Sequence, residues 1–262
     1  MRILAVGDPH GKIPKHLPKD IDLILLNGDL GSSDLLRKHA FENKERRMKG
    51  LPPIEFPPKE VKKAFMEAYN TSLKVVRYLA KLAPVYLVYG NVESSNAETK
   101  EHSKEIGLPL PFLTDSLNKI KNVHIINNRA VNFSGIRIGG LEYFLDTCWV
   151  REFKPGEYRE KLKEAKKETD KARRVLEKFQ NLDILLCHQP PYKILDKVTA
   201  KFAPKSWIGK HAGSKAVLDY IRKYQLRYVF CGHIHEAAGH KRIGNTEIYN
   251  LGISRCTLIE ID

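Results

Sequence analysis

The sequence lacks any long apolar segment. No stretch is apolar enough to span a bilayer. Residues 1–6 run straight into Gly7-Asp8, without the apolar core and small-residue cleavage site of a signal peptide. Internal repeats and low-complexity tracts are absent as well. We therefore expect an intracellular, cytoplasmic protein with no membrane partner.

The sequence is also poor in cysteine, with four residues and no Cys-x-x-Cys pair among them. This spacing argues against both a zinc ribbon and a redox motif. We expect these cysteines to be ordinary thiols of the core; they are Cys148, Cys187, Cys231 and Cys256.

Basic residues clearly outnumber acidic ones. Lys and Arg total 45 against 31 Asp and Glu, which gives a net charge of +14 and an isoelectric point near 9.5. A balance of this kind attracts anions over long distances. It favours a phosphorylated substrate, such as a phosphorylated small molecule or a nucleotide, and nucleic acid as a further candidate partner, but it does not identify them.

Short runs rich in Ile, Leu and Val predict buried strands at residues 2–6, 22–27 and 85–89. Each run is followed by glycine and then by aspartate or asparagine. Polar residues at such strand ends often belong to functional sites. Residues 123–144 are largely apolar between turn signals, and this pattern predicts a meander of strands.

Apolar residues at helical spacing predict helices at residues 59–82, 157–179 and 214–224. Early in the chain, the predicted strands mostly pair with helices, and late in the chain they mostly pair with each other. This order predicts a layered α/β (α+β) protein with two sheets. The length fits one domain, residues 1–262, with helical insertions near 40–82 and 151–181. The late strands are expected at residues 183–187, 228–231, 246–250 and 256–261.

Five short motifs follow the predicted strands, and their polar residues are all of metal-ligand type. Carboxylate, amide oxygen and imidazole together suit divalent transition metals, whereas all-oxygen sets favour magnesium or calcium and thiolate sets a structural zinc. Each motif alone is common, so the prediction of a dinuclear site depends on their conjunction and order. In chain order the motifs are Asp8-Pro9-His10, Gly28-Asp29, Gly90-Asn91, His188 and Gly232-His233-Ile234-His235.

Two of these motifs place ligand residues two positions apart. In an extended chain such residues point to the same side, so Asp8 and His10 can converge, and so can His233 and His235, if their loops stay extended.

The five motifs match those of the calcineurin-like metallophosphoesterases in type and order, and the resemblance spans nearly the whole chain. It implies two mixed β-sheets packed face to face and flanked by helices. It also implies two divalent transition-metal ions (Mn, Fe, Zn or Ni), with no residue assigned to any other cofactor. One ion would be held by Asp8, His10 and His235 and the other by Asn91, His188 and His233, with Asp29 bridging them. Asp29 and Asn91 are the expected catalytic residues.

The sequence departs from this family at one position. Relatives read Gly-Asn-His followed by an acid, and their histidine contacts the phosphate and helps to protonate the leaving group. Here Gly90-Asn91 is followed by Val92 and Glu93. Valine has no proton to give, so a general acid worth about 10²–10⁴-fold is missing. Three other histidines are candidate substitutes, although each fits an exposed surface position better: His16, His102 and His211.

The expected function is hydrolysis of phosphate esters by a hydroxide that bridges two metal ions, which resemblance to the family implies. Without the histidine, substrates with good leaving groups are favoured, so we expect a phosphodiesterase. One alternative is a nuclease acting on single-stranded or damaged nucleic acid, suggested by the net charge of +14 and the basic segments 59–81 and 161–178. The other is a protein-interaction scaffold that has kept its metal ligands but lost hydrolysis.

Overall fold

Two mixed β-sheets form the centre of the protein in the computed structural model, which describes residues 1–152, 155–201, 203, 205 and 207–261. The first sheet has the strand order β11-β1-β2-β3-β4 and the second the order β5-β6-β7-β8-β10-β9. In the first sheet every neighbouring pair is parallel except β1 with β11. In the second, the edge pairs β5 with β6 and β10 with β9 are antiparallel and the others are parallel.

The strands of the first sheet are β11 (Cys256–Glu260), β1 (Arg2–Val6), β2 (Leu23–Leu26), β3 (Val85–Leu87) and β4 (Val123–Ile125). Those of the second are β5 (Arg129–Phe133), β6 (Ile136–Leu141), β7 (Ile184–Cys187), β8 (Tyr228–Cys231), β10 (Thr246–Asn250) and β9 (Gly239–Ile243).

Both faces of the central strands are apolar, because each face packs against a different layer. Ile3 and Leu25 from the first sheet meet Ile184 and Phe230 from the second in one core between the sheets. The residues in between, such as Leu4, point to the opposite face and pack under helices. The expected sandwich of two mixed sheets flanked by helices is thereby confirmed.

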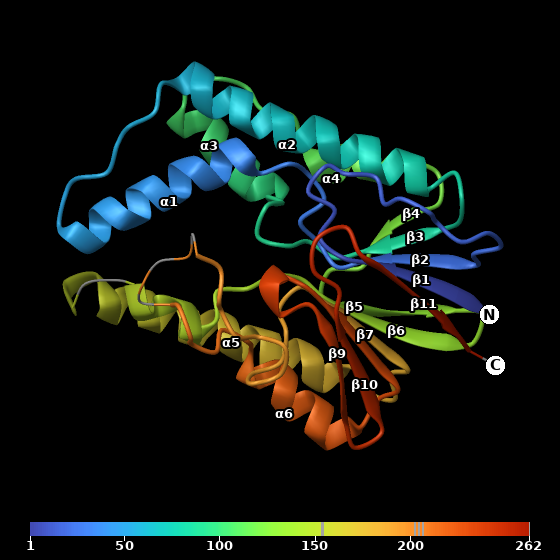
Figure 1. The fold of residues 1–262 in the computed structure, drawn as a ribbon. Coiled ribbons are helices and arrows are strands. Elements are labelled where there is room, and N and C mark those ends of the chain that lie inside the picture. The colour runs from blue at the N-terminus through green and yellow to red at the C-terminus, as the bar shows by residue number, and fades with distance from the viewer. Residues whose placement is uncertain (153–154, 202, 204, 206, 262) are drawn as a thin grey trace.

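Helices cover the outer face of each sheet (Figure 1). The helix α2 (Pro58–Leu79) packs its apolar stripe on the first sheet together with α4 (Leu113–Asn118). The second sheet is covered by α5 (Pro155–Lys178) and α6 (Lys215–Tyr224). The remaining helices are α1 (Asp34–Lys49), α3 (Asn96–Glu105) and the short 3₁₀ helices η1 (Thr147–Glu152) and η2 (His235–Ala237). Among the described residues, no helix combines the length and apolar character needed to cross a membrane.

Two expectations from the sequence are wrong in detail. Residues 123–144 do not form one meander: β4 joins the first sheet in parallel, and only β5 and β6 form a hairpin, in the second sheet. The chain changes layers between β4 and β5, and alternation of apolar residues does not distinguish the two layers. Cys187 and Cys231 are core thiols as expected, but Cys256 is exposed on an edge strand and Cys148 is partly exposed.

Candidate metal centre

The predicted ligands lie at one edge of the sandwich, where parallel strands of both sheets end. Asp8 and His10 follow β1, Asp29 follows β2 and Asn91 follows β3 in the first sheet. The second sheet contributes residues after β7 and β8, namely His188, His233 and His235. The structure therefore brings all seven predicted residues to the same edge.

Tight turns, and not extended loops, aim these side chains. His10, Asp29 and His233 have positive φ angles of 43°, 47° and 66°. This left-handed conformation is costly for residues other than glycine and is found mainly at functional sites. The expectation that Asp8 and His10, and likewise His233 and His235, converge along extended chain is wrong, because the chain turns sharply between them.

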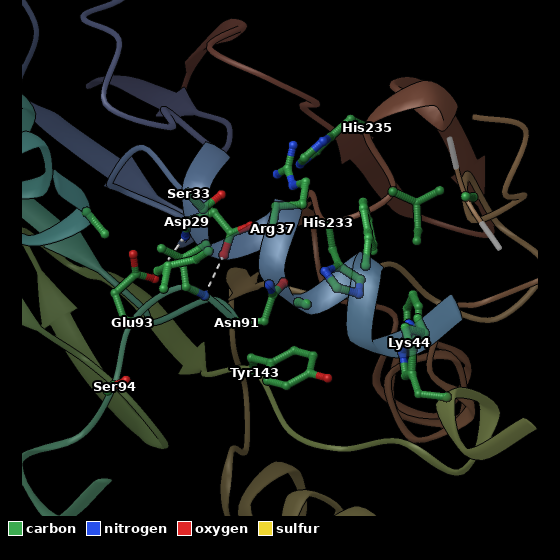
Figure 2. Close-up of a pocket in the computed structure, with 18 of the residues that line it drawn as sticks. Asp29, Ser33, Arg37, Lys44, Asn91, Glu93, Ser94, Tyr143, His233 and His235 are labelled. Atoms are coloured by element: carbon green, nitrogen blue, oxygen red, sulfur yellow. Dashed lines mark hydrogen bonds between the residues drawn. The ribbon is translucent and has the colours of Figure 1, made fainter. Parts of the chain in front are cut away.

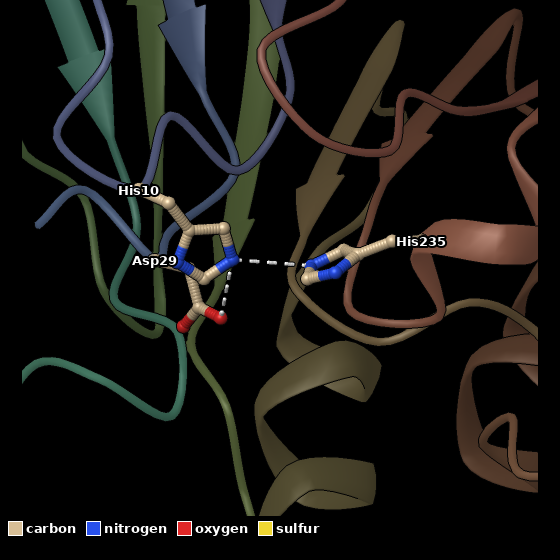
Figure 3. Close-up of side chains that lie close together, drawn as sticks. All are labelled: His10, Asp29 and His235. Atoms are coloured by element: carbon tan, nitrogen blue, oxygen red, sulfur yellow. Dashed lines mark hydrogen bonds and ion pairs between the residues drawn. The ribbon is translucent and has the colours of Figure 1, made fainter. Parts of the chain in front are cut away.

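One group of side chains forms around His10 (Figure 3). Its Nε2 lies 3.3 Å from Nε2 of His235 and 3.6 Å from Oδ2 of Asp29. Nε2 of His235 lies 2.9 Å from Oδ2 of Asp8. Ligand atoms of His10, Asp29 and His235 all lie within 4.8 Å of one another, close enough to hold one metal ion.

A second group forms around the buried His188. Its Nε2 lies 3.0 Å from Oδ1 of Asn91, 3.1 Å from Nδ1 of His233 and 3.6 Å from Oδ1 of Asp29. The two oxygens of Asp29 thus face different groups, Oδ2 toward His10 and Oδ1 toward His188. This is the arrangement that a bridging carboxylate requires.

Hydrogen bonds from neighbouring residues orient the groups. Nδ1 of His188 lies 2.9 Å from the carbonyl oxygen of Asn27, which only accepts, so Nδ1 carries the proton and Nε2 is left with a lone pair in the neutral ring. The side chain of Asn27 accepts from the backbone N–H of Asp8 over 3.0 Å. Asn27 thus links a ligand loop of the second sheet, that of His188, to one of the first sheet, that of Asp8.

Glu93 holds two ligand loops together. Its carboxylate accepts hydrogen bonds from the backbone N–H groups of Asp29, Leu30 and Gly90 at 2.7 to 2.9 Å. Figure 2 shows the bond from Asp29. Burial, and then the negative charge of Asp29, raise the pKa of Glu93 to about 7. Glu93, which lacks the histidine partner usual in the family, thus acts as a hydrogen-bond acceptor behind the proposed ligands.

The electrostatics of the site favour a cation. Burial alone would lower the pKa of His188, but the carboxylates of Asp29 and Asp8 outweigh it, so the pKa is raised. Burial and the charge of His188 together lower the pKa of His233 well below its usual value. In Asp8, burial works against a lowered pKa, but the hydrogen bond from His235 and the charge of His188 prevail. The carboxylate of Asp8 therefore stays ionised and attracts positive charge.

The donor set fits divalent metal ions. Oδ1 of Asp8 and Nε2 of His233 are buried without a hydrogen-bond partner among the described residues, which is costly in a protein interior. Around His188, Oδ1 of Asn91 and Oδ1 of Asp29 both face Nε2, so a positive charge at this place stabilises the group. Imidazole, carboxylate and amide oxygen are ligands typical of Mn, Fe, Ni or Zn sites.

The close approach of the ligand loops requires glycine. At Gly90 an added Cβ would lie 2.3 Å from Oδ1 of Asp29, and at Gly232 it would lie 2.4 Å from Oδ1 of Asp8. A side chain at either position would displace a proposed ligand.

A pocket of about 700 Å³ opens beside the site (Figure 2). Its wall includes Asp29, Asn91, His233 and His235, together with side chains of α1. The predicted helical insertion near residues 40–82 overlaps α1, but the sequence did not delimit this helix or single out Arg37, since α1 has no apolar stripe to reveal it. Nη2 of Arg37 lies 3.3 Å from Nε2 of His10.

The three histidines that could substitute for the missing one lie in different places. His102 lines the mouth of the pocket and is exposed, as expected. His16 is also exposed, and the described pocket wall does not include it. His211 is only partly exposed. Its Nδ1 lies 2.6 Å from Oδ1 of Asp196, and the described pocket wall includes neither residue.

Comparisons with solved structures agree with this fold. One solved structure aligns with a TM-score of 0.60 at 16% identity, over 98% of this chain and 94% of that one. A protein from Thermus thermophilus and a dimetal phosphatase from Danio rerio align with TM-scores of 0.44 and 0.45, each at 12% identity. Both cover 97% of this chain, and the matched shares of their own chains are 90% and 88%. The likeness to the first of these structures, at 16% identity, concerns the fold alone.

No curated protein is similar enough in sequence to count as a match. A family model described as calcineurin-like phosphoesterase, in contrast, matches residues 1–237, which include all seven predicted ligands. The chain therefore belongs to the calcineurin-like phosphoesterase family, as its motifs predicted, and is a metal-dependent hydrolase that acts on phosphate esters.

Proposed function

We propose that the protein is a phosphodiesterase with two metal ions. Asp8, His10 and His235 hold one ion, Asn91, His188 and His233 hold the other, and Asp29 bridges them. The position of Asp29 carries the proposal, because its two oxygens face the two separate groups of ligands at 3.6 Å each. Manganese, iron, zinc and nickel all suit this donor set.

When bound, two such ions polarise a phosphoryl oxygen and lower the pKa of an attacking water. The chain's own residues set the geometry. Asp29 fixes the spacing between the two groups, and Glu93 fixes Asp29 by accepting its N–H. Asn91 sits at the exposed side of the site, on the wall of the pocket where a substrate enters.

The preference for diesters follows from Val92. This residue lines the pocket next to Asn91 and has no group that can protonate a leaving oxygen. Among the described residues that line the pocket, His102 is the histidine outside the proposed ligand set, and it is exposed to solvent. Hydrolysis therefore favours esters whose leaving group needs no proton, such as aryl and nucleotide diesters, over alkyl monoesters.

Metal analysis tests the site. Protein purified without chelator should contain close to two transition-metal ions per chain, and Asp29→Asn should lose both, because Asp29 contacts each ion. Lys38→Gln, an exposed change on α1 that also alters the charge by one, should keep both. No bound metal in the wild type and no uptake of added manganese would refute the assignment.

Activity on four substrates tests the class of reaction. We expect the metal-loaded protein to cleave a bis-aryl phosphate faster than an aryl monophosphate, with cyclic nucleotides and single-stranded DNA as the other two substrates. Cleavage of DNA alone would support the nuclease. A complete metal complement with no activity on any of the four would support the scaffold.

A further inference from the structure

A single arginine points into the metal centre from outside the predicted ligand set. Arg37 lies one turn into α1, is partly buried, and places Nη2 3.3 Å from Nε2 of His10. Ser33, at the start of the same helix, is buried with its Oγ 3.4 Å from Nδ1 of the same ring. Figure 2 shows Arg37 beside His235 and above Asp29, on the wall of the pocket.

This position has an electrostatic consequence. Nε2 of His10 is the atom that would bind a metal ion, and it cannot accept a hydrogen bond from Arg37 at the same time. A divalent ion and a guanidinium so close together repel each other strongly where water is partly excluded. An anion between them removes this repulsion. A phosphate group is such an anion, and guanidinium groups bind phosphate with paired hydrogen bonds.

Arginine differs from the missing histidine in one respect that matters. A guanidinium stabilises negative charge but stays protonated at all pH values that proteins tolerate, so it cannot give a proton. Val92 cannot give one either. The site thus contains a residue for the charge of the leaving group and, among the described pocket residues, no buried histidine for its protonation other than the proposed ligands.

Two further basic side chains of α1 line the pocket, Lys44 and Arg47, together with Leu36, Ala40, Phe41 and Asn43. Lys44 and Arg47 follow Arg37 at seven and ten residues, which places them on roughly the same side of the helix. Nζ of Lys44 lies 3.4 Å from the centre of the Trp207 ring.

We infer that Arg37 binds the phosphate of the substrate in place of the family's histidine, and that the site, which has this guanidinium but no proton donor, is selective for leaving groups that depart as anions, above all a phosphate. The substrate class is then a phosphoanhydride, such as a nucleoside diphosphate, together with aryl diesters. This inference deepens the proposed function and depends on it.

The bond changes balance without a proton donor. Water forms a P–O bond with the phosphorus and loses a proton to solvent. The P–O bond to the leaving group breaks, and its electron pair stays on the leaving oxygen, which departs as an anion beside the guanidinium of Arg37. No oxidant, reductant or further reactant is needed.

Binding of inorganic phosphate provides a test that does not depend on turnover. Calorimetry on metal-loaded protein should give a dissociation constant at least about tenfold weaker for Arg37→Gln than for the wild type, since a charged hydrogen bond to phosphate is lost. Lys38→Gln removes an equal charge from an exposed position on the same helix and should stay within about twofold. Metal content is measured in every sample.

These results separate the inference from the proposed function. If no variant and no wild-type protein holds metal, the proposed function is wrong. If metal content is intact but Arg37→Gln binds phosphate as well as the wild type does, the inference is wrong, and Arg37 merely fills the ligand site. Tighter metal binding by Arg37→Gln with unchanged phosphate affinity has the same meaning.

Turnover then tests the leaving group. The wild type should cleave a nucleoside diphosphate faster than a dialkyl phosphate, and Arg37→Gln should lose at least about tenfold in kcat/KM on the diphosphate, with Arg37→Lys in between because lysine keeps the charge but not the paired geometry. Faster cleavage of the dialkyl phosphate by the wild type would overturn the inference.

Discussion

Val92 lies next to the proposed ligand Asn91 and contacts the proposed ligand Asp29. Its side chain lines the pocket, and its backbone N–H donates to Oδ1 of Asp29 over 3.1 Å. A substitution at this position changes what faces the substrate but keeps the backbone contact that orients the bridging carboxylate.

Val92→His should therefore add a proton donor without removing a ligand. We expect turnover of diesters with alkyl leaving groups to rise by roughly tenfold, part of what a native general acid contributes, and turnover of aryl esters to rise less. The measurement is the slope of log rate against the pKa of the leaving group, which should be steeper and negative in the wild type.

His102→Ala is the matched control for this prediction, because His102 also lines the pocket but is exposed at its mouth. It should leave the slope unchanged. Equal slopes for the wild type and Val92→His, with a large loss of rate in His102→Ala, would mean that His102 already supplies the proton. The same outcome in His211→Ala would point to His211, despite its pairing with Asp196.

Residue types and order were enough to predict the proposed ligands, since each directly follows an apolar strand. The turns that aim them were not predictable in the same way. Positive φ angles at His10, Asp29 and His233 depend on contacts with the opposite loops, such as the hydrogen bond from the N–H of His10 to the carbonyl oxygen of Asp29. Arg37 escaped notice because a lone arginine in a polar segment has no local signature.

The loops that follow β2 and β3 behave as one unit because of Glu93. Its carboxylate accepts two N–H groups from the first loop and one from the second. The amide of glutamine has a single acceptor oxygen and directs its NH₂ group toward donors. Glu93→Gln should lower the free energy of unfolding by about 1–3 kcal/mol, because buried N–H groups lose their partner.

Urea denaturation in the presence of a chelator measures this loss without a contribution from bound metal. Glu101→Gln removes the same charge from an exposed position on α3 and should change stability little. If both variants are as stable as the wild type, the three N–H groups must find other partners, and the role given to Glu93 fails.

Helices were predictable from the sequence only where they bury an apolar stripe. The stripe of α2 includes Val75, Val76 and Leu79, which pack on the first sheet, and a proline marks its start. In contrast, α1 is polar on most sides, and residues of its inner face, such as Ser33 and Arg37, face the pocket and the metal centre. A helix that faces a site and not a core leaves no periodic signal.

At the scale of the whole molecule, we expect the basic residues behind the net charge of +14 to contribute unequally to the attraction of an anionic substrate. On α5, acidic residues offset the basic ones, as in the ion pair of Lys161 with Glu164 at 2.7 Å and that of Arg173 with Asp219 on α6 at 3.1 Å. Arg37, Lys44 and Arg47 of α1 lie closer to the proposed site, because they line the pocket beside it. Attraction of an anionic substrate should therefore come mainly from α1.

Salt dependence tests this distribution. Between about 10 mM and about 150 mM salt the screening length falls from roughly 30 Å to about 8 Å. We expect kcat/KM for an anionic diester to fall by about tenfold over this range, while kcat at saturation stays nearly constant. The double change Lys44→Gln with Arg47→Gln should flatten the dependence.

The matched control removes two charges from α5, with Lys166→Gln and Lys167→Gln at exposed positions. This variant should keep the salt dependence of the wild type. Equal flattening by both pairs would show that the total charge, and not its location on α1, attracts the substrate.

The division of the proposed ligands between the two sheets has a consequence for how long the fold survives. Each group combines side chains that follow strands of the first sheet with others that follow strands of the second. Neither group is complete until the layers have docked, so the ions bind only the native chain. Interactions formed after the transition state slow unfolding and leave the folding rate unchanged. We therefore expect bound metal to hold the two layers together. Removal of the metal by a chelator should shorten the lifetime of the native state without changing the folding rate.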